Sequence, residues 1–181
     1  MGSDPRLRVR GAPLLVSVLL VSVLLGAPIS VVACLGLAAA GDAAKPASPI
    51  YGVTVPDGYR DWRLVAPALE DAPLNELRAV LGNDLAVKAF RDGTLPFPDG
   101  TVLVKLAWER KHYFDTATVP GPATTVQVMV KDAKRYPDTG GWGFGRFIDG
   151  KPVDAAQHQT CFACHEARVK ARDFVFTRYA R

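Results

Sequence analysis

The sequence predicts a mainly β (α+β) fold, in which one antiparallel sheet is accompanied by a few short helices. Three observations support this prediction. The chain has 181 residues, which is enough for one domain. Beyond residue 50 its apolar patterns mostly repeat every second residue, as on a strand with one buried face. Its 16 Gly and 14 Pro disfavour the long helices of a four-helix bundle.

Residues 1–42 predict an export signal. Three arginines in residues 6–10 precede an uncharged apolar run at 14–25, and three alanines at 38–40 offer a cleavage site. The apolar stretch of residues 12–40 is also long enough to span a bilayer, so an uncleaved inner-membrane anchor stays open. Cys34 loosely fits a lipoprotein signal, although the apolar residues after it favour a passive leader position. Each interpretation delivers the domain to the periplasm.

The rest of the chain divides into a linker at residues 43–50, rich in Ala, Pro and Ser, and a domain at 51–181. A net charge of +4 without a run of Lys or Arg gives no support to nucleic-acid binding. The apolar content excludes intrinsic disorder. Three scattered cysteines exclude a disulfide-stapled mini-protein.

The predicted strands are runs of β-branched and aromatic residues. One helix is expected at residues 84–91, because Asn83 can cap its beginning and Gly93 its end. A second short helix is expected at 164–171. In chain order the strands are expected at residues 62–65, 77–81, 101–108, 125–130, 142–148 and 173–179.

Cys161, Cys164 and His165 form the pattern C-x-x-C-H, the attachment site of c-type haem. Two thiols at this spacing bond to the two vinyl groups of the porphyrin, and the adjacent histidine becomes the proximal iron ligand. Alternative interpretations are a disulfide, a redox C-x-x-C or half of a zinc site. The zinc site lacks ligands, since only His112 and His158 remain to supply nitrogen. A mono-haem c cofactor, cupped by the sheet and helices, is therefore predicted.

The chain from about residue 51 to 180 resembles the cytochrome P460 family, which includes cytochrome c′-beta. The resemblance rests on PDGYRDW at residues 56–62, DGTVLVK at 99–105, VKDAKRY at 130–136, GWGF at 141–144 and FVFTRY at 174–179. It implies a haem c protein acting on small nitrogen compounds such as hydroxylamine or nitric oxide. It also implies a homodimer as the typical assembly.

Lys105 lies on a predicted strand, sharing one face with Leu103 and Ala107. The pattern alone leaves open a solvated edge residue or a partly buried amine. The resemblance implies more: in the P460 branch a matching lysine is bonded to the haem edge, whereas the c′-beta branch lacks this cross-link and binds gases. An apolar pocket would favour the bond by lowering the lysine pKa.

The resemblance places Arg78 in the wall of the distal pocket, where a guanidinium can hydrogen-bond a ligand. A surface arginine on a strand is the alternative. Trp142 and Phe144 are expected near the porphyrin, because Gly143 and Gly145 permit close approach. Ordinary core packing is the alternative for both aromatic residues.

The family pattern leaves the sixth iron position open. Three residues could fill it instead and make an electron carrier: His158, which we expect on a loop, His112, which we expect to face solvent, and Met129, which we expect in the core. A hydroxylamine oxidase also needs a proton acceptor. The expected loop before the haem motif offers only Asp154 and Gln157, and neither can be assigned.

Three functions follow in order of preference. The first is a periplasmic haem oxidoreductase that oxidises hydroxylamine or nitric oxide and passes electrons to a soluble periplasmic acceptor. The second is a five-coordinate protein that binds nitric oxide or carbon monoxide without turnover. The third is a six-coordinate electron carrier.

Overall fold

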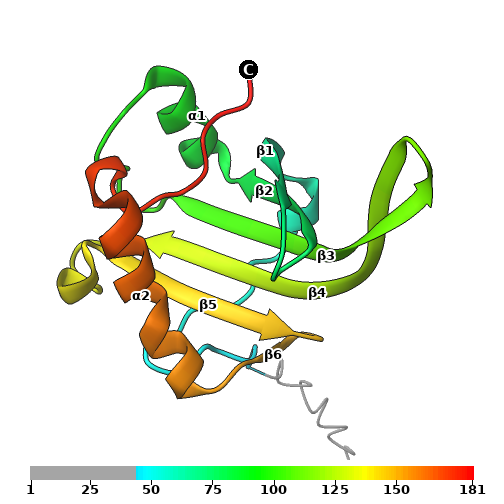
Figure 1. The fold of residues 1–181 in the computed structure, drawn as a ribbon. Coiled ribbons are helices and arrows are strands. Elements are labelled where there is room, and N and C mark those ends of the chain that lie inside the picture. The colour runs from blue at the N-terminus through cyan, green and yellow to red at the C-terminus, as the bar shows by residue number, and fades with distance from the viewer. Residues whose placement is uncertain (1–43) are drawn as a thin grey trace, which may run out of the picture. The chain divides into compact units, whose positions relative to one another are not determined.

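The computed structural model describes residues 44–181, and the predicted leader with Cys34 lies outside them. A single six-stranded antiparallel sheet forms the domain, and its strands are ordered as they occur in the chain (Figure 1). They are β1 (Arg63–Glu70), β2 (Glu76–Gly82), β3 (Val102–Phe114), β4 (Ala117–Lys131), β5 (Trp142–Ile148) and β6 (Lys151–Pro152). The predicted mainly β antiparallel fold is confirmed.

The helices are α1 (Asp84–Asp92) and α2 (Ala155–Val169), with three short 3₁₀ turns at Tyr59–Asp61, Pro137–Thr139 and Lys170–Arg172. Helix α1 confirms its prediction: the Asn83 side chain accepts a hydrogen bond from the Ala86 amide, and Gly93 ends the helix in the left-handed conformation. Within residues 44–181 no helix is long and apolar enough to cross a membrane.

The sheet has two different faces, because paired residues of antiparallel strands point the same way. One face, which we call the α2 face, carries Val80, Leu103, Lys105, Met129 and Phe144. Helix α2 packs against β5 and lies across this face, and the C-terminal segment runs over it towards α1 (Figure 1).

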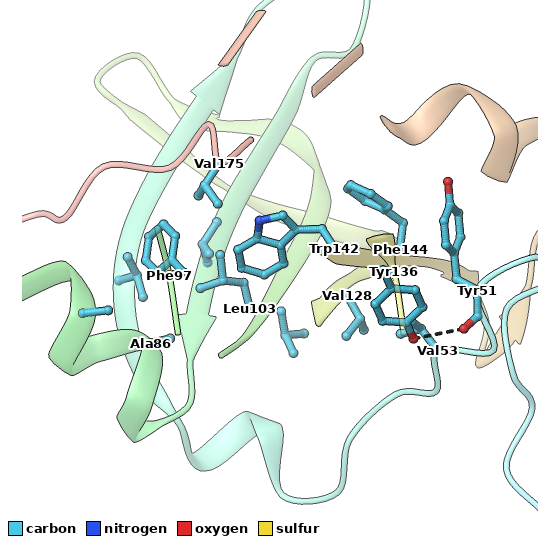
Figure 2. Close-up of a cluster of buried hydrophobic side chains, with 14 of the residues drawn as sticks. Tyr51, Val53, Ala86, Phe97, Leu103, Val128, Tyr136, Trp142, Phe144 and Val175 are labelled. Carbon is cyan, nitrogen blue, oxygen red and sulfur yellow. Dashed lines mark hydrogen bonds between the residues drawn. The ribbon is translucent and has the colours of Figure 1, made fainter. Parts of the chain in front are cut away.

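The opposite face carries Val104, Val128 and Phe147, which are all buried. The segment before β1 covers it, with Val53 lying against Gly145 of β5. Figure 2 shows the buried aromatic residues along the sheet, including the hydrogen bond that the Tyr136 hydroxyl donates to the Tyr51 carbonyl. Ser48, inside the predicted linker, is also buried and donates a hydrogen bond to the Phe144 carbonyl.

The strand predicted at residues 173–179 is wrong. Its side chains do alternate, with Val175 buried and Phe176 exposed, so the period-two pattern was real. Asp173 and Phe174, however, have φ values of 50° and 63°, which a strand does not tolerate. The segment crosses the face of the sheet as an extended chain, and among the described residues its one backbone hydrogen bond to a strand runs from the Ala180 amide to the Val65 carbonyl of β1, at 2.9 Å.

The helix predicted at residues 164–171 begins nine residues earlier, at Ala155. The Asp154 side chain caps it by accepting a hydrogen bond from the Gln157 amide at 2.8 Å. The first turn is mostly exposed, so no apolar stripe marked it in the sequence. The expected loop around His158 is therefore helical.

Gly143 provides a stability test. A Cβ atom at this position would overlap the Tyr136 ring, which is buried and held by its hydrogen bond to Tyr51. We expect Gly143→Ala to lower the free energy of unfolding by about 1–3 kcal/mol in chemical denaturation. In the control Gly121→Ala, the Cβ would meet the exposed Lys111 side chain, which can move, and lie 3.2 Å from the Glu109 carbonyl, so we expect a smaller loss of about 0.5–1 kcal/mol. Equal effects of the two substitutions would contradict the packing argument.

Candidate haem site

Helix α2 brings the C-x-x-C-H residues to one side. Positions i, i+3 and i+4 of a helix lie on the same face, so Cys161, Cys164 and His165 point together. Cys161 is half-buried and Cys164 is exposed, and neither forms a disulfide. Burial raises the pKa of the Cys161 thiol.

A cavity of about 790 Å³ separates α2 from the α2 face of the sheet. Its volume falls within the range of about 300–1,000 Å³ that is usual for ligand and cofactor pockets. Both cysteines and His165 line it on the helix side. The sheet contributes Ala66, Ala68, Glu70, Arg78, Val80, Leu103, Lys105, Gln127, Met129, Phe144 and Arg146, and the C-terminal segment contributes Val175 to Arg178.

His165 is held in the form that an iron ligand requires. Its Nδ1 atom lies 2.7 Å from the Phe174 carbonyl oxygen. A carbonyl can only accept, so Nδ1 carries the proton and Nε2 keeps its lone pair for a metal. The rings of Phe144 and Phe176 meet the imidazole edge-on at 5.0 and 4.9 Å. Burial lowers the pKa of His165, which also favours the neutral form.

Lys105 lines the same cavity from near the beginning of β3. Burial is the main cause that lowers its pKa from 10.5 to about 8, and the nearby Arg78 charge acts in the same direction. The carboxylate of Glu76 opposes the shift only in part. Of the two interpretations that the sequence allowed, this favours the partly buried amine.

Arg78 also lines the cavity and is held between two carboxylates. Its guanidinium lies 2.7 Å from Glu70 and 2.9 Å from Glu76. Glu76 accepts a further hydrogen bond from the Thr124 hydroxyl at 2.9 Å. Burial tends to raise the pKa of Glu76, but the bonds from Arg78 and Thr124 outweigh it, so the pKa is lowered. The arginine is thus fixed, and its charge is balanced.

Arg146 and Gln127 are cavity residues that the sequence reasoning missed. The period-two pattern of β5 could have indicated Arg146, because it shares a face with Trp142 and Phe144. The Nε atom of Arg146 is buried and has no hydrogen-bond partner among residues 44–181. A carboxylate of a bound group would satisfy it, and haem carries two propionates. The cavity therefore suits a haem: its volume is sufficient, two thiols and an imidazole line it, and its positive charge can bind the propionates.

The expectation for the two aromatic residues holds for only one of them. Phe144 lines the cavity. Trp142 lies outside the lining and packs in the core against Phe97, with ring centroids 5.8 Å apart. The space that Gly143 leaves is filled by Tyr136 and not by a cofactor. The argument for close approach of a porphyrin is therefore wrong for Gly143, whereas Gly145 does line the cavity.

The candidates for a sixth ligand lie in different places. His158 is fully buried: its Nδ1 lies 2.8 Å from the Asp154 carbonyl, and its Nε2 accepts a hydrogen bond from the Arg146 amide. His112 is exposed on the β3–β4 hairpin. Met129, which we expected in the core, is half-buried and lines the cavity. Gln157 also lines it, whereas Asp154 serves as the cap of α2.

Within the described part of the chain, no group of three or more His, Cys, Asp or Glu side chains is arranged to hold a metal ion. Comparison with protein families gives one match: the model of the cytochrome P460 family covers residues 56–177. A search of curated proteins finds no match to this chain.

His158 provides a test of the site's coordination. We expect His158→Gln in the haem-loaded protein to leave the visible spectrum unchanged, because both ring nitrogens bond to backbone atoms. The free energy of unfolding should fall by about 1–2 kcal/mol, since glutamine replaces those bonds imperfectly. His112→Gln is the control and should alter neither property. A changed spectrum in His158→Gln alone would make His158 an iron ligand.

Proposed function

This chain belongs to the cytochrome P460 family, and from that premise we propose that it is a periplasmic cytochrome that oxidises hydroxylamine or nitric oxide. Membership implies a c-type haem protein and haem oxidoreductase activity in general. The proposal adds a haem bonded to Lys105, an open iron position and a soluble electron acceptor. One observation carries it: Cys161, Cys164, His165 and Lys105 line a single cavity.

The chain's own residues supply every attachment that the proposal needs. Cys161 and Cys164 would bond through sulfur to the vinyl groups, and His165 would offer Nε2 to the iron. Arg146 supplies an unpartnered donor for a propionate. When bound, the haem iron supplies the redox centre and the position for a small nitrogen compound.

Lys105 is proposed to bond to the haem edge through Nζ. Only a neutral amine has the lone pair for this bond, and a pKa of about 8 leaves an appreciable neutral fraction near neutral pH. Such a bond would replace one hydrogen of the amine and one of the haem edge, so two protons and two electrons would leave, and a two-electron oxidant such as a peroxide would have to accept the electrons. Through this bond Lys105 would alter the electronics of the haem.

Arg78 and Glu70 are proposed to handle the substrate. Three N–H groups of Arg78 face the two carboxylates, so its remaining N–H groups can donate to a bound nitrogen compound. Oxidation of hydroxylamine releases protons as well as electrons, so a proton acceptor is needed. Glu70 is the one carboxylate among the described lining residues, so it is our candidate for the proton acceptor.

A second function has its own support. Glu70 is already engaged by Arg78, and much of the surrounding wall is apolar, with Ala66, Ala68 and Val80. Such a wall can hold a neutral gas while offering little help with protons. A five-coordinate protein that binds nitric oxide or carbon monoxide without turnover would have this cavity.

Export is proposed from the leader at residues 1–42. Haem c is attached after export, which agrees with the presence of C-x-x-C-H in the same chain. The membrane-anchored form through residues 12–40 stays an alternative to cleavage.

Lys105→Leu is the main test of the proposal. The dithionite-reduced wild-type protein, matured in a periplasm, should show a red-shifted and broadened Soret band if Lys105 is bonded to the haem. Lys105→Leu should keep the thioether bonds and show the Soret band of an ordinary c-type haem. Hydroxylamine oxidation, followed with an artificial electron acceptor, should be lost with the shifted band.

Lys111→Leu is the matched control, because Lys111 lies on the same strand but is exposed and pairs with Glu109. It should leave the spectrum as in the wild type. A wild-type spectrum identical to that of Lys105→Leu would exclude the cross-link and favour the gas-binding function.

Glu70→Gln separates oxidation from binding. Loss of a general base slows a proton-dependent step by about 100-fold or more, so hydroxylamine oxidation should fall by that factor. Carbon monoxide affinity, measured by optical titration of the reduced protein, should change little because no proton moves. Glu109→Gln, an exposed carboxylate of β3, serves as the control. An unchanged oxidation rate in Glu70→Gln would exclude Glu70 as the base.

A further inference from the structure

A buried ion pair joins the sheet to the C-terminal segment. Lys131, the last residue of β4, places Nζ 2.8 Å from both carboxylate oxygens of Asp173. The two side chains are only 6% and 9% exposed. The other ion pairs of the described chain each include at least one more exposed partner, so this pair has a distinct environment.

Further bonds fix both partners in place. Lys131 Nζ donates to the Gly140 carbonyl at 2.8 Å, and its charge lies 5.1 Å from the centre of the Trp142 ring. Asp173 accepts a hydrogen bond from the Phe97 amide at 2.8 Å. The carboxylate is therefore bound to two elements at once: the end of β4 and the loop before β3.

Asp173 is also the residue that turns the chain towards the haem motif. Asp173 and Phe174 adopt consecutive left-handed conformations without being glycine, which requires outside support. The turn directs the Phe174 carbonyl at His165 Nδ1, 2.7 Å away. The carbonyl that orients the imidazole thus lies one residue from the buried ion pair.

We propose that Lys131 and Asp173 are positioning residues for the proximal ligand: the ion pair holds the turn that keeps the Phe174 carbonyl hydrogen-bonded to His165. The inference rests on the proposed role of His165 as the iron ligand. A hydrogen bond at Nδ1 increases the electron donation of the imidazole through Nε2. The ion pair therefore helps to set how strongly His165 donates, although it touches neither iron nor substrate.

Loss of the ion pair should change the reduction potential and the iron–histidine stretching frequency in defined directions. Without the ion pair the turn relaxes, the bond to Nδ1 weakens, and His165 becomes a weaker donor. A weaker donor stabilises ferric iron less, so the reduction potential rises. The iron–histidine bond also weakens, so its stretching frequency falls.

The test uses the haem-loaded full chain. Asp173→Asn keeps the shape and an oxygen acceptor for the Phe97 amide but removes the charge. Lys131→Gln is the milder second variant, because its amide can still donate to the Gly140 carbonyl. In both variants the iron–histidine stretching frequency of the reduced protein, measured by resonance Raman spectroscopy, should fall. Their reduction potential, measured by redox titration, should rise. Lys131→Arg, which keeps the ion pair, should restore both towards wild type.

Lys170→Met is the matched control, since Lys170 makes an exposed ion pair with Glu166 beside the haem motif. It should shift neither property. Unchanged stretch and potential in folded Asp173→Asn and Lys131→Gln would overturn the inference. Failure of both variants to fold, with a normal control, would also overturn it and leave the pair a purely structural one.

The wild-type measurement separates the two levels of the proposal. If the wild type shows no iron–histidine stretch, or Cys161 and Cys164 carry no haem, the proposed function itself fails. If the wild type shows the stretch but Asp173→Asn does not change it, only the positioning role fails.

Discussion

The hydrogen bond between His165 and the Phe174 carbonyl joins the two segments that cover the α2 face of the sheet. Helix α2 brings the imidazole, and the C-terminal segment brings the carbonyl. Neither segment belongs to the sheet, so the cavity that they enclose against it depends on contacts of this kind. The Phe144 ring of β5 completes the arrangement by packing edge-on against the imidazole. The sheet thus forms one side of the cavity, and a single hydrogen bond fixes both the His165 side chain and the C-terminal segment that lies over the sheet.

The charges around the cavity form a second constraint. Its described lining includes the cations Arg78, Lys105, Arg146, Arg168 and Arg178, but Glu70 is the one carboxylate. Like charges in a poorly solvated space raise each other's energy, which contributes to the lowered pKa of Lys105. A group that carries two carboxylates would relieve this imbalance. The positive charge that helps burial to lower the Lys105 pKa therefore also favours the binding of a haem, with its two propionates.

The sequence predicted correctly the element whose formation depends on residues close to it in the chain. Helix α1 follows from Asn83 and Gly93, because both caps lie next to it in the chain. The C-terminal segment shows the limit: alternation around Val175 reports an extended chain with one buried side, but not whether that chain pairs with an edge or crosses a face. Likewise, alternation put Lys105 with Leu103, while only the tertiary structure shows that this face holds the cavity. Arg146 was missed because the period-two pattern of β5 assigns it to a face but does not show that the cavity lies on that face.

The two proposed functions, oxidation and gas binding, differ in how Arg78 and Glu70 divide their interactions between each other and a bound substrate. Arg78 needs Glu70 and Glu76 to remain in a cavity that already contains other cations. The Glu70 carboxylate lies 2.7 Å from the Arg78 guanidinium, so the proton acceptor that we propose is already engaged in an ion pair. In the proposed oxidation, Glu70 would have to accept substrate protons while it also balances Arg78. The gas-binding alternative would need no other residues, because an ion pair that never released Glu70 would let a ligand bind without accepting its protons.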